Sequence, residues 1–317
     1  MKQAPGGEFA LISSFLKPFG GRPDLGAGVL VGPGSDCAVM KVSPGQQLVV
    51  TTDAAFEGVH FDLGLSAPED AGHKALAMNL SDLAAAGARP RWFLCALGVP
   101  AGALRPSEQA ARFARGMAAL ARRHQIALVG GNVTSALQWS LTITALGEAR
   151  RPLTRAGGKP GDALVVVGRL GGAALGLREL RAGAPSRRAA AQLRPVPLCD
   201  AGLVAARYAS ASIDVSDGLL ADLGHLLKAS RCGARLDAEA LPLSPRATLP
   251  QALTGGEDYA LLLAVSPRRL PALLAALREP VAVVGSLERN PGLRVVSHGA
   301  PLALPEERGW DHLRGGR

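Results

Sequence analysis

The sequence has few aromatic residues and no long apolar run. Phenylalanine, tryptophan and tyrosine make up only 4% of its 317 residues, few for a protein that would stack the bases of a nucleic acid. No apolar segment approaches the ~20 residues needed to cross a bilayer. The N-terminal residues also lack the long apolar stretch of a signal peptide. We therefore predict a cytoplasmic protein with no membrane partner.

Cysteine is scarce as well. Cys37, Cys95, Cys199 and Cys232 form neither a C-x-x-C pair nor the spacing of a zinc site. We interpret them as small buried hydrophobic residues in a reducing compartment, with a redox or metal-thiolate role as the alternative. The cysteines therefore do not direct the functional prediction.

The familiar phosphate-binding motifs are missing too. The chain has no Walker A sequence, no kinase-type glycine loop with its lysine and no G-x-S-x-G turn. Its segment VVVGRLGGAALG lacks the G-x-G-x-x-G spacing of a dinucleotide-binding loop. A nucleotide enzyme built on this chain must therefore hold phosphates through metal ions and glycine turns.

Basic residues outnumber acidic ones by 35 to 26, which gives a formal net charge of +9. The arginines are dispersed, for example in pairs at 122–123, 150–151 and 187–188, rather than massed on one element. A small polyanionic substrate such as a nucleotide fits this pattern better than a nucleic acid does. We predict no nucleic-acid partner.

The length predicts about two domains. A basic segment rich in glycine and proline, residues 151–162, predicts a boundary between domains of residues 1–150 and 151–317. Both halves mix strands and helices without one simple parallel winding, so the predicted fold class is α+β. We expect helices at 9–16, 66–87, 106–124 and 172–183, strands at 46–52, 92–100, 126–131, 139–149, 163–168, 257–265 and 281–285, and a strand running into a helix at 212–233.

Several aspartates follow or interrupt apolar segments that are expected in the core. An unpaired carboxylate there costs several kcal/mol, so these acids suggest a shared cation. Thr51, Thr52 and Asp53 are predicted at a strand end, where hydroxyl and carboxylate oxygens suit a hard cation such as Mg2+. The alternative is an ordinary Asx turn that leaves the strand.

Asp82 lies on the predicted helix near whose start Ser66 and Glu69 have capping-box spacing. Ala75, Asn79 and Asp82 share one helix face, beside an apolar stripe that must pack inward. Asp82 is therefore expected at the edge of buried surface, where it needs a partner. A metal ion and a buried salt bridge to an arginine are the two candidates.

Further acids and glycines lie in turns. Asp214 and Asp217 flank Ser216 just before a helix, and a helix cap formed by Ser216 or Asp217 is the alternative to a metal role. Glu257 follows a glycine turn that leads into a strand. Gly131 ends the strand predicted at 126–131, at a loop signal where bare main-chain amides can approach a phosphate closely.

The chain resembles the thiamine-monophosphate kinases, which belong to the superfamily of aminoimidazole ribonucleotide synthetase. Eight ordered segments carry the resemblance: GPGSDCAVM, LVVTTDAAFEGVHF, HKALAMNLSDLAAAGA, LVGGNVTS, LTRAGGKPGD, IDVSDGLLADLGHLLKAS, TGGEDYALLL and RGWDHL. They span nearly the whole chain, and the ordered set is highly specific. The resemblance implies the two-domain fold of that superfamily, with a C-terminal α/β sandwich and a homodimer whose N-terminal sheets pair.

The resemblance also implies ATP-dependent phosphorylation of thiamine monophosphate to thiamine diphosphate, with several Mg2+ ions and with ATP as co-substrate. The N-terminal domain would bind ATP and Mg2+ and dimerise, and the C-terminal domain would complete the site. The acceptor phosphate, whose second pKa is near ~6, is already ionised at neutral pH and needs no general base. We expect direct in-line transfer without a phosphoenzyme.

The resemblance assigns roles to individual residues. The implied metal ligands are Asp36, Thr51, Thr52, Asp53, Asp82, Asn132, Asp214 and Asp217. The implied ATP contacts are Gly131, Asn132, Arg155 and Ser216, and the implied contacts to thiamine phosphate are His60, Glu257 and Trp310. Transfer would rely on the metals together with Asp217 and Arg155.

Two positions depart from the family pattern. The family usually has two aspartates where this chain has Ser35 and Asp36, and Asp36 keeps the ligand position. The family commonly has an aspartate where this chain has Asn132, which offers a carbonyl oxygen but no negative charge. We therefore expect one Mg2+ to bind more weakly or to gain another ligand.

Other functions fit the sequence less well. The N-terminal loop has no cysteine or selenocysteine of the kind expected in selenophosphate synthetase, and the tail RGGR lacks the terminal cysteine of the hydrogenase maturation protein. Another ATP-using member of the superfamily is the nearest alternative. A catalytically inactive, basic RNA-binding module is the alternative of a different class.

Overall fold

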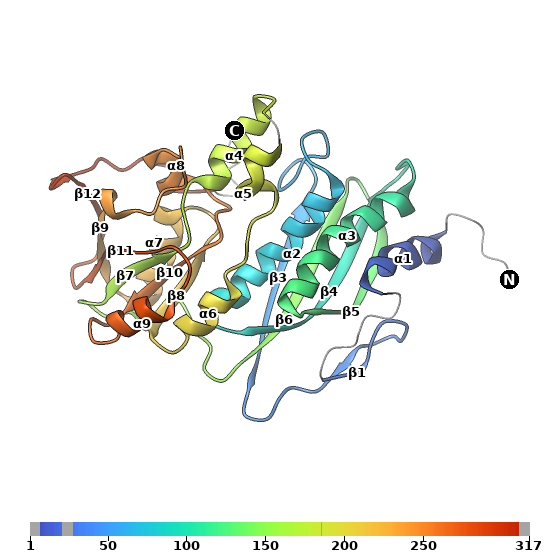
Figure 1. The fold of residues 1–317 in the computed structure, drawn as a ribbon, viewed down its shortest axis with the longest axis horizontal. Helices are drawn as coiled ribbons and strands as arrows, with labels where there is room; N and C mark the ends of the chain where they lie inside the picture. Colours follow the sequence, from blue (N-terminus) through green and yellow to red (C-terminus); the bar gives the residue numbers. More distant parts are fainter. Residues whose placement is uncertain (1–6, 21–27, 185, 311–317) are drawn as a thin grey trace. The chain divides into compact units, whose positions relative to one another are not determined.

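The computed structural model describes residues 7–20, 28–184 and 186–310. The chain divides into two compact units (Figure 1). Unit 1 comprises Met1–Leu83 and Arg89–Arg150, and unit 2 comprises Ala84–Ala88 and Arg151–Arg317. Each unit combines helices with a sheet, which confirms the α+β class. No helix in the described ranges is both long and apolar enough to cross a membrane.

The core of unit 1 is a four-stranded sheet in the order β3-β6-β4-β5. Its strands are β3 (Gln47–Phe56), β4 (Arg89–Pro100), β5 (Ala127–Ala136) and β6 (Ser140–Ala149). β4 and β5 run parallel because helix α3 (Pro106–His124) carries the chain between them, whereas the other pairs are antiparallel. This mixed order matches the expectation that no single parallel winding is present.

The two long helices of unit 1, α2 (Pro68–Ala85) and α3, cover one face of this sheet (Figure 1). Helix α1 (Glu8–Leu16), which the apolar pattern of the segment predicts, packs along α3. On the opposite face, the ribbon of β1 (Val29–Val31) and β2 (Val39–Met40) packs against a small cluster that contains Trp92 and Leu146. One face of the sheet is therefore covered by helices and the other is only partly covered.

Three local predictions in unit 1 are corrected by the structure. The segment from Thr51 to Asp53 lies within β3, not at its end, and Gly131 lies within β5, which continues to Ala136, not at the end of a strand. The predicted capping box is also wrong. Ser66 donates its hydroxyl to the carbonyl of Asp62, and the carboxylate that reaches back over the start of α2 is that of Asp70, which accepts from the amide of residue 67.

Unit 2 is built on a seven-stranded sheet in the order β13-β12-β9-β11-β7-β10-β8. The strands are β7 (Ala163–Val167), β8 (Ala209–Val215), β9 (Gly233–Asp237), β10 (Ala260–Val265), β11 (Val281–Glu288), β12 (Leu293–Ser297) and β13 (Ala300–Pro301). The helices are α4 (Gly172–Arg181), α5 (Ala190–Leu193), α6 (Cys199–Ala205), α7 (Leu219–Ser230), α8 (Leu249–Thr254) and α9 (Leu270–Ala276). Of its strand pairs, β9 with β12 is parallel and the others are antiparallel.

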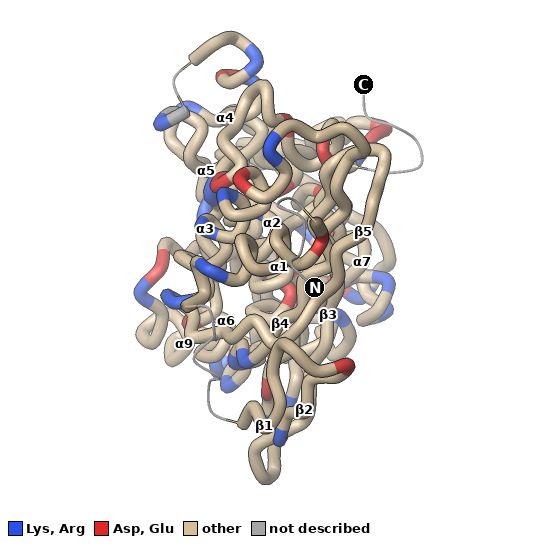
Figure 2. Tube along the Cα trace, turned by 90° about the vertical axis from the view of Figure 1, so that its right-hand side faces the viewer, with Lys and Arg blue, Asp and Glu red and all other residues tan. Residues whose placement is uncertain are grey.

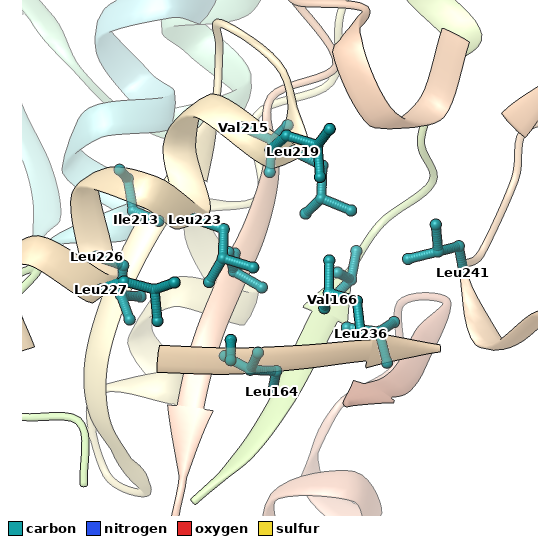
Figure 3. Close-up of a cluster of buried hydrophobic side chains, with 14 of the residues drawn as sticks. Leu164, Val166, Ile213, Val215, Leu219, Leu223, Leu226, Leu227, Leu236 and Leu241 are labelled. Atoms are coloured by element: carbon teal, nitrogen blue, oxygen red, sulfur yellow. The ribbon is translucent and has the colours of Figure 1, made fainter. Parts of the chain in front are cut away.

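The core of unit 2 lies between α7 and this sheet (Figure 3). Leu223 and Leu226 of α7 are fully buried in one cluster with side chains of the sheet, such as Leu164 of β7 and Ile213 of β8. Central strands that are buried along their whole length read as continuous apolar runs, and this explains why β7 and β10 were predicted from sequence.

Truncation of this core should destabilise the protein markedly. We expect Leu223→Ala to lower the free energy of unfolding by about 2–5 kcal/mol, because the removed side chain is fully buried and leaves a cavity. Leu137→Ala makes the same chemical change at a fully exposed side chain and should change it by less than about 0.5 kcal/mol. Urea unfolding followed by circular dichroism measures both; equal effects would contradict the packing shown in Figure 3.

Candidate active site

In unit 1, strand β3 places Thr51 and Asp53 on the face that the helices cover. Residues of a strand point alternately to its two faces, and along β3 the more buried positions alternate with exposed ones. From this face the Thr51 hydroxyl donates to Oδ2 of Asp82 on α2 at 2.5 Å. The alternative of an Asx turn at Asp53 is wrong because this residue lies within β3. Asp82 has a hydroxyl partner at the edge of buried surface.

Thr52 points to the other face of the same strand. Its hydroxyl donates to the carbonyl of Ile143 at 3.0 Å and lies 3.1 Å from the hydroxyl of Thr144, its cross-strand neighbour. The two adjacent threonines therefore present their hydroxyls on opposite faces of the sheet. Their adjacency in the sequence is the reason that both are predicted as oxygen ligands of one cation.

Asn132 is exposed on β5, opposite Ala96 of β4. β5 and β3 form the two edges of the sheet, with β4 and β6 between them. Three interstrand spacings separate the edges, which is roughly 14 Å along the sheet. The sheet of unit 1 therefore does not bring Asn132 and Asp53 together.

His60 and Asp36 lie outside the regular strands of unit 1. His60 sits in the turn after β3, where its Nδ1 accepts from the amide of Phe56 at 3.1 Å. The carbonyl of His60 accepts from the ammonium group of buried Lys74 at 2.8 Å. Asp36 is exposed in the connection between β1 and β2. The turn at His60 is thus fixed at both its side chain and its main chain.

In unit 2, the predicted acids lie at the end of β8 and in the loop that follows. Asp214 is buried within β8, paired with β10, and Asp217 is in the loop before α7. Neither Ser216 nor Asp217 caps the helix, because Gly218 occupies the N-cap position with no side-chain bond. The helix-cap alternative is therefore wrong.

The loop is held instead by Asp222, which the sequence reading did not single out. One oxygen, Oδ2, accepts from the amides of Ser216, Asp217 and Gly218 at 3.0, 3.1 and 3.1 Å. Burial raises the pKa of Asp222 to about 7, with a further contribution from the Asp217 charge, against the lowering effect of the three N–H groups. In the sequence, Asp222 resembles any acid in a first helical turn, so it gave no distinct signal.

The carbonyl groups of the same loop bind two other predicted site residues. The Ser216 carbonyl accepts from the amide of Glu257 at 2.7 Å, and the Asp217 carbonyl accepts from the amide of Trp310 at 2.9 Å. A Cβ at Gly256 would lie only 2.5 Å from the Ser216 carbonyl oxygen, so the close approach requires glycine. The structure thus joins Ser216, Asp217, Glu257 and Trp310 through their backbones.

Glu257 and Asp258 have separate tasks in the neighbouring turn. Glu257 adopts a positive φ of 66°, and its Oε2 accepts from Nε2 of buried Gln192 at 2.7 Å. Asp258 accepts from the amides of Gly171 at 2.6 Å and Ala173 at 3.0 Å, and so caps the start of α4. Burial raises the pKa of Asp258 to about 6 although these N–H groups lower it.

Arg155 and Gly131 have clear structural surroundings. Arg155 is exposed, and its carbonyl accepts from the hydroxyl of Ser230 at 2.9 Å, which holds this segment onto unit 2. A Cβ at Gly131 would lie 2.1 Å from the Cys95 carbonyl oxygen, so glycine is required for β5 to pair with β4. The glycine therefore has a structural reason independent of phosphate binding.

Each unit presents hydroxyl and carboxylate oxygens, a type of atom that suits a hard cation. Unit 1 presents a threonine hydroxyl bonded to a carboxylate at Thr51 and Asp82, and unit 2 presents Asp214 and Asp217 around one strand end. Within the described part of the chain, no three His, Cys, Asp or Glu side chains lie close enough together to hold a metal ion.

Known proteins resemble this chain over nearly its whole length. The family described as AIR synthase related protein matches with its N-terminal domain at residues 34–149 and with its C-terminal domain at residues 159–298. Thiamine-monophosphate kinase of Salmonella typhimurium is 37% identical, covering 97% of this chain and 98% of that protein. The crystal structure of thiamine-monophosphate kinase from Stenotrophomonas maltophilia K279a has a TM-score of 0.80 at 36% identity, covering 93% of this chain and 98% of that chain.

A further solved structure contains bound ligands. It is described as AaThiL complexed with AMPPCP and TMP, and it has a TM-score of 0.76 at 29% identity. The match covers 98% of this chain and 99% of that chain. These similarities extend across both units of the present structure.

The raised pKa of Asp258 predicts a pH dependence of stability. Between about pH 4 and pH 6 the folded protein holds this proton more tightly than the unfolded chain does, so the free energy of unfolding that Asp258 contributes falls as the pH rises, by at most about 1.4 kcal/mol per pH unit. Asp258→Asn should lack this slope. Urea unfolding across this interval measures it, with Asp200→Asn, an exposed acid, as the control. Parallel profiles for wild type and Asp258→Asn would contradict it.

Proposed function

The chain belongs to the AIR synthase related protein family and, within it, to the thiamine-monophosphate kinases, and we propose that it transfers the terminal phosphoryl group of ATP to thiamine monophosphate. The products are thiamine diphosphate and ADP. The observation that carries the proposal is the likeness, over both units, to kinases of this name and to the complex that holds AMPPCP and TMP.

The chemistry of the acceptor determines what the site must supply. Thiamine monophosphate is largely ionised near neutral pH, because the second pKa of a phosphate monoester is about 6. Its oxygen attacks the terminal phosphorus of ATP, a new P–O bond forms, and the bond to the ADP oxygen breaks. Since nucleophile and target are both anions, charge neutralisation and alignment are needed rather than a general base. We propose direct transfer, without a phosphoenzyme.

We propose that oxygen ligands in each unit hold Mg2+. The ligands in unit 1 are Asp36, Thr51, Thr52, Asp53, Asp82 and Asn132, and those in unit 2 are Asp214 and Asp217. When bound, Mg2+ would neutralise phosphate charge and help to align the reacting groups. The hydrogen bond from Thr51 to Asp82 supports the proposal because it places a hydroxyl and a carboxylate oxygen side by side.

The remaining residues of the proposal bind the two substrates. Gly131, Asn132, Arg155 and Ser216 contact ATP, and the exposed Arg155 guanidinium adds a fixed positive charge that requires no metal. His60, Glu257 and Trp310 contact thiamine monophosphate. The backbone bonds that join Ser216 to Glu257 and Asp217 to Trp310 support an assignment in which both substrates are bound next to the same loop.

We also propose a homodimer that pairs through the face of the unit 1 sheet not covered by α2 and α3. Leu48, Val50 and Phe56 of β3 lie on this face and are 47%, 56% and 39% exposed. Exposed apolar side chains gathered on one strand face are typical of an interaction surface. A second copy of the chain is the partner that the resemblance to the family implies.

Nucleic acid is not part of the proposal. Figure 2 shows lysine and arginine spread over many segments of the trace rather than gathered along one helix or strand. The 35 basic and 26 acidic residues are likewise spread along the whole sequence. A nucleic-acid surface would require a continuous basic stripe.

Loss of a proposed metal ligand should abolish most of the activity. Purified protein with ATP and Mg2+ should form thiamine diphosphate from thiamine monophosphate, and Asp53→Asn and Asp82→Asn should each lower kcat by on the order of a hundredfold or more. Asp200→Asn, at an exposed acid of α6, is the matched control and should leave kcat unchanged. No product from the wild-type protein, or full activity in both site variants, would refute the proposal. Tight, salt-sensitive RNA binding without turnover would favour the binding module instead.

A charge on the open sheet face should dissociate the dimer. Val50→Asp places a carboxylate within the proposed apolar contact and should convert the dimer to a monomer, because the buried charge would lack a partner. Leu137→Asp adds the same charge at a fully exposed leucine elsewhere and should leave the dimer intact. Analytical ultracentrifugation distinguishes the two; a wild-type monomer, or a dimeric Val50→Asp protein, would exclude this interface.

A further inference from the structure

We propose that Asp222 is a positioning residue for the phosphoryl-transfer site, one that sets the loop of residues 216–218 and, through this loop, the places of Glu257 and Trp310. The inference deepens the proposed function and rests on it for its catalytic consequence. Its structural content stands on contacts within unit 2 alone.

The first observation is that one carboxylate oxygen accepts hydrogen bonds from all three amides of the loop. Oδ2 of Asp222 lies 3.0–3.1 Å from the amide nitrogens of three consecutive residues, Ser216 to Gly218. Consecutive N–H groups that point to one spot form an anion-binding nest. Here the anion is a side chain of the protein, only 2% exposed. The nest is therefore filled from within and serves to shape the loop, not to cradle a substrate phosphate.

The second observation concerns the opposite side of the same peptides. The carbonyls of Ser216 and Asp217 accept from the amides of Glu257 and Trp310, at 2.7 and 2.9 Å. Each donor follows a glycine whose Cβ would collide with the loop, at 2.5 Å for Gly256 and 2.6 Å for Gly309. Close packing thus makes the positions of two distant segments depend on the orientation of the loop peptides.

These contacts form a chain of dependence that starts at Asp222. The peptide planes that present their N–H groups to Asp222 are the ones that present their carbonyls to Glu257 and Trp310, because the two groups of a peptide point in opposite directions. Rotation of a loop peptide would weaken bonds on both sides at once. The carboxylate therefore fixes the loop that carries Ser216 and Asp217 together with the two residues assigned to thiamine phosphate.

Alanine and asparagine at position 222 test this dependence. Asp222→Ala removes the acceptor, whereas Asp222→Asn keeps one carbonyl oxygen of similar reach and should partly rescue the enzyme. We expect Asp222→Ala to raise KM for both ATP and thiamine monophosphate and to lower kcat tenfold or more. Each factor of ten in kcat corresponds to about 1.4 kcal/mol of activation free energy. Asp200→Ala, another acid in a first helical turn, should behave as wild type. A folded Asp222→Ala protein with wild-type KM and kcat would overturn the inference.

Hydrogen exchange followed by mass spectrometry or NMR separates this inference from the proposed function. In Asp222→Asn we expect faster exchange at the amides of residues 216–218 and also at the amides of Glu257 and Trp310, whether or not the protein is a kinase. Faster exchange confined to residues 216–218 would show that the loop does not govern the other two segments. If Asp222→Ala does not fold, the asparagine variant alone decides, by its two KM values and its exchange pattern.

Discussion

A carboxylate that leaves water must be compensated by donors or cations, and this requirement organises the polar interior of both units. In unit 2, Asp222 is compensated by three loop amides and Asp258 by the amides at the start of α4. In unit 1, Asp82 is compensated by the hydroxyl of Thr51. Each contact ties a side chain to a segment whose conformation it helps to define. These acids therefore have a structural role that does not depend on any ligand.

The segment IDVSDGLLAD contains two acids with different roles, one bonded to the main chain and one carried by the loop. Asp222 has its Oδ2 taken by main-chain N–H groups and defines the loop. Asp217 is carried by that loop and raises the pKa of Asp222 by its charge. An acid that shapes the loop and an acid that we propose as a metal ligand are thus neighbours in one motif, and they repel each other. A cation at Asp217 would relieve that repulsion, which is a physical reason for the pair to occur where metal binding is proposed.

Much of the fold could be predicted from the sequence, because long elements carry periodic patterns. The helix at 106–124 has its predicted bounds, the strand predicted at 163–168 ends at residue 167, and the strand predicted at 257–265 begins at residue 260. β2 and β13 are missed because their two residues show no period, and β9 is missed because its five residues form no apolar run like that of β7. Within the candidate site, motif order predicts roles for Ser216 and Glu257, but their bond through the backbone depends on which peptides face each other, and no sequence pattern records that.

The register of the unit 1 sheet adds a constraint that motif order could not contain. Asn132 lies on one edge strand and Asp53 on the other, so the sheet by itself does not place both residues around one metal ion. Thr52 and Asn132 nevertheless share the face that the helices leave open, by the register of β3, β6, β4 and β5. That is the face through which we propose that two copies pair. Because Asp53 points to the covered face, pairing through the open face would place Thr52 and Asn132, but not Asp53, at the interface, where a neutral Asn132 avoids the desolvation cost of an aspartate.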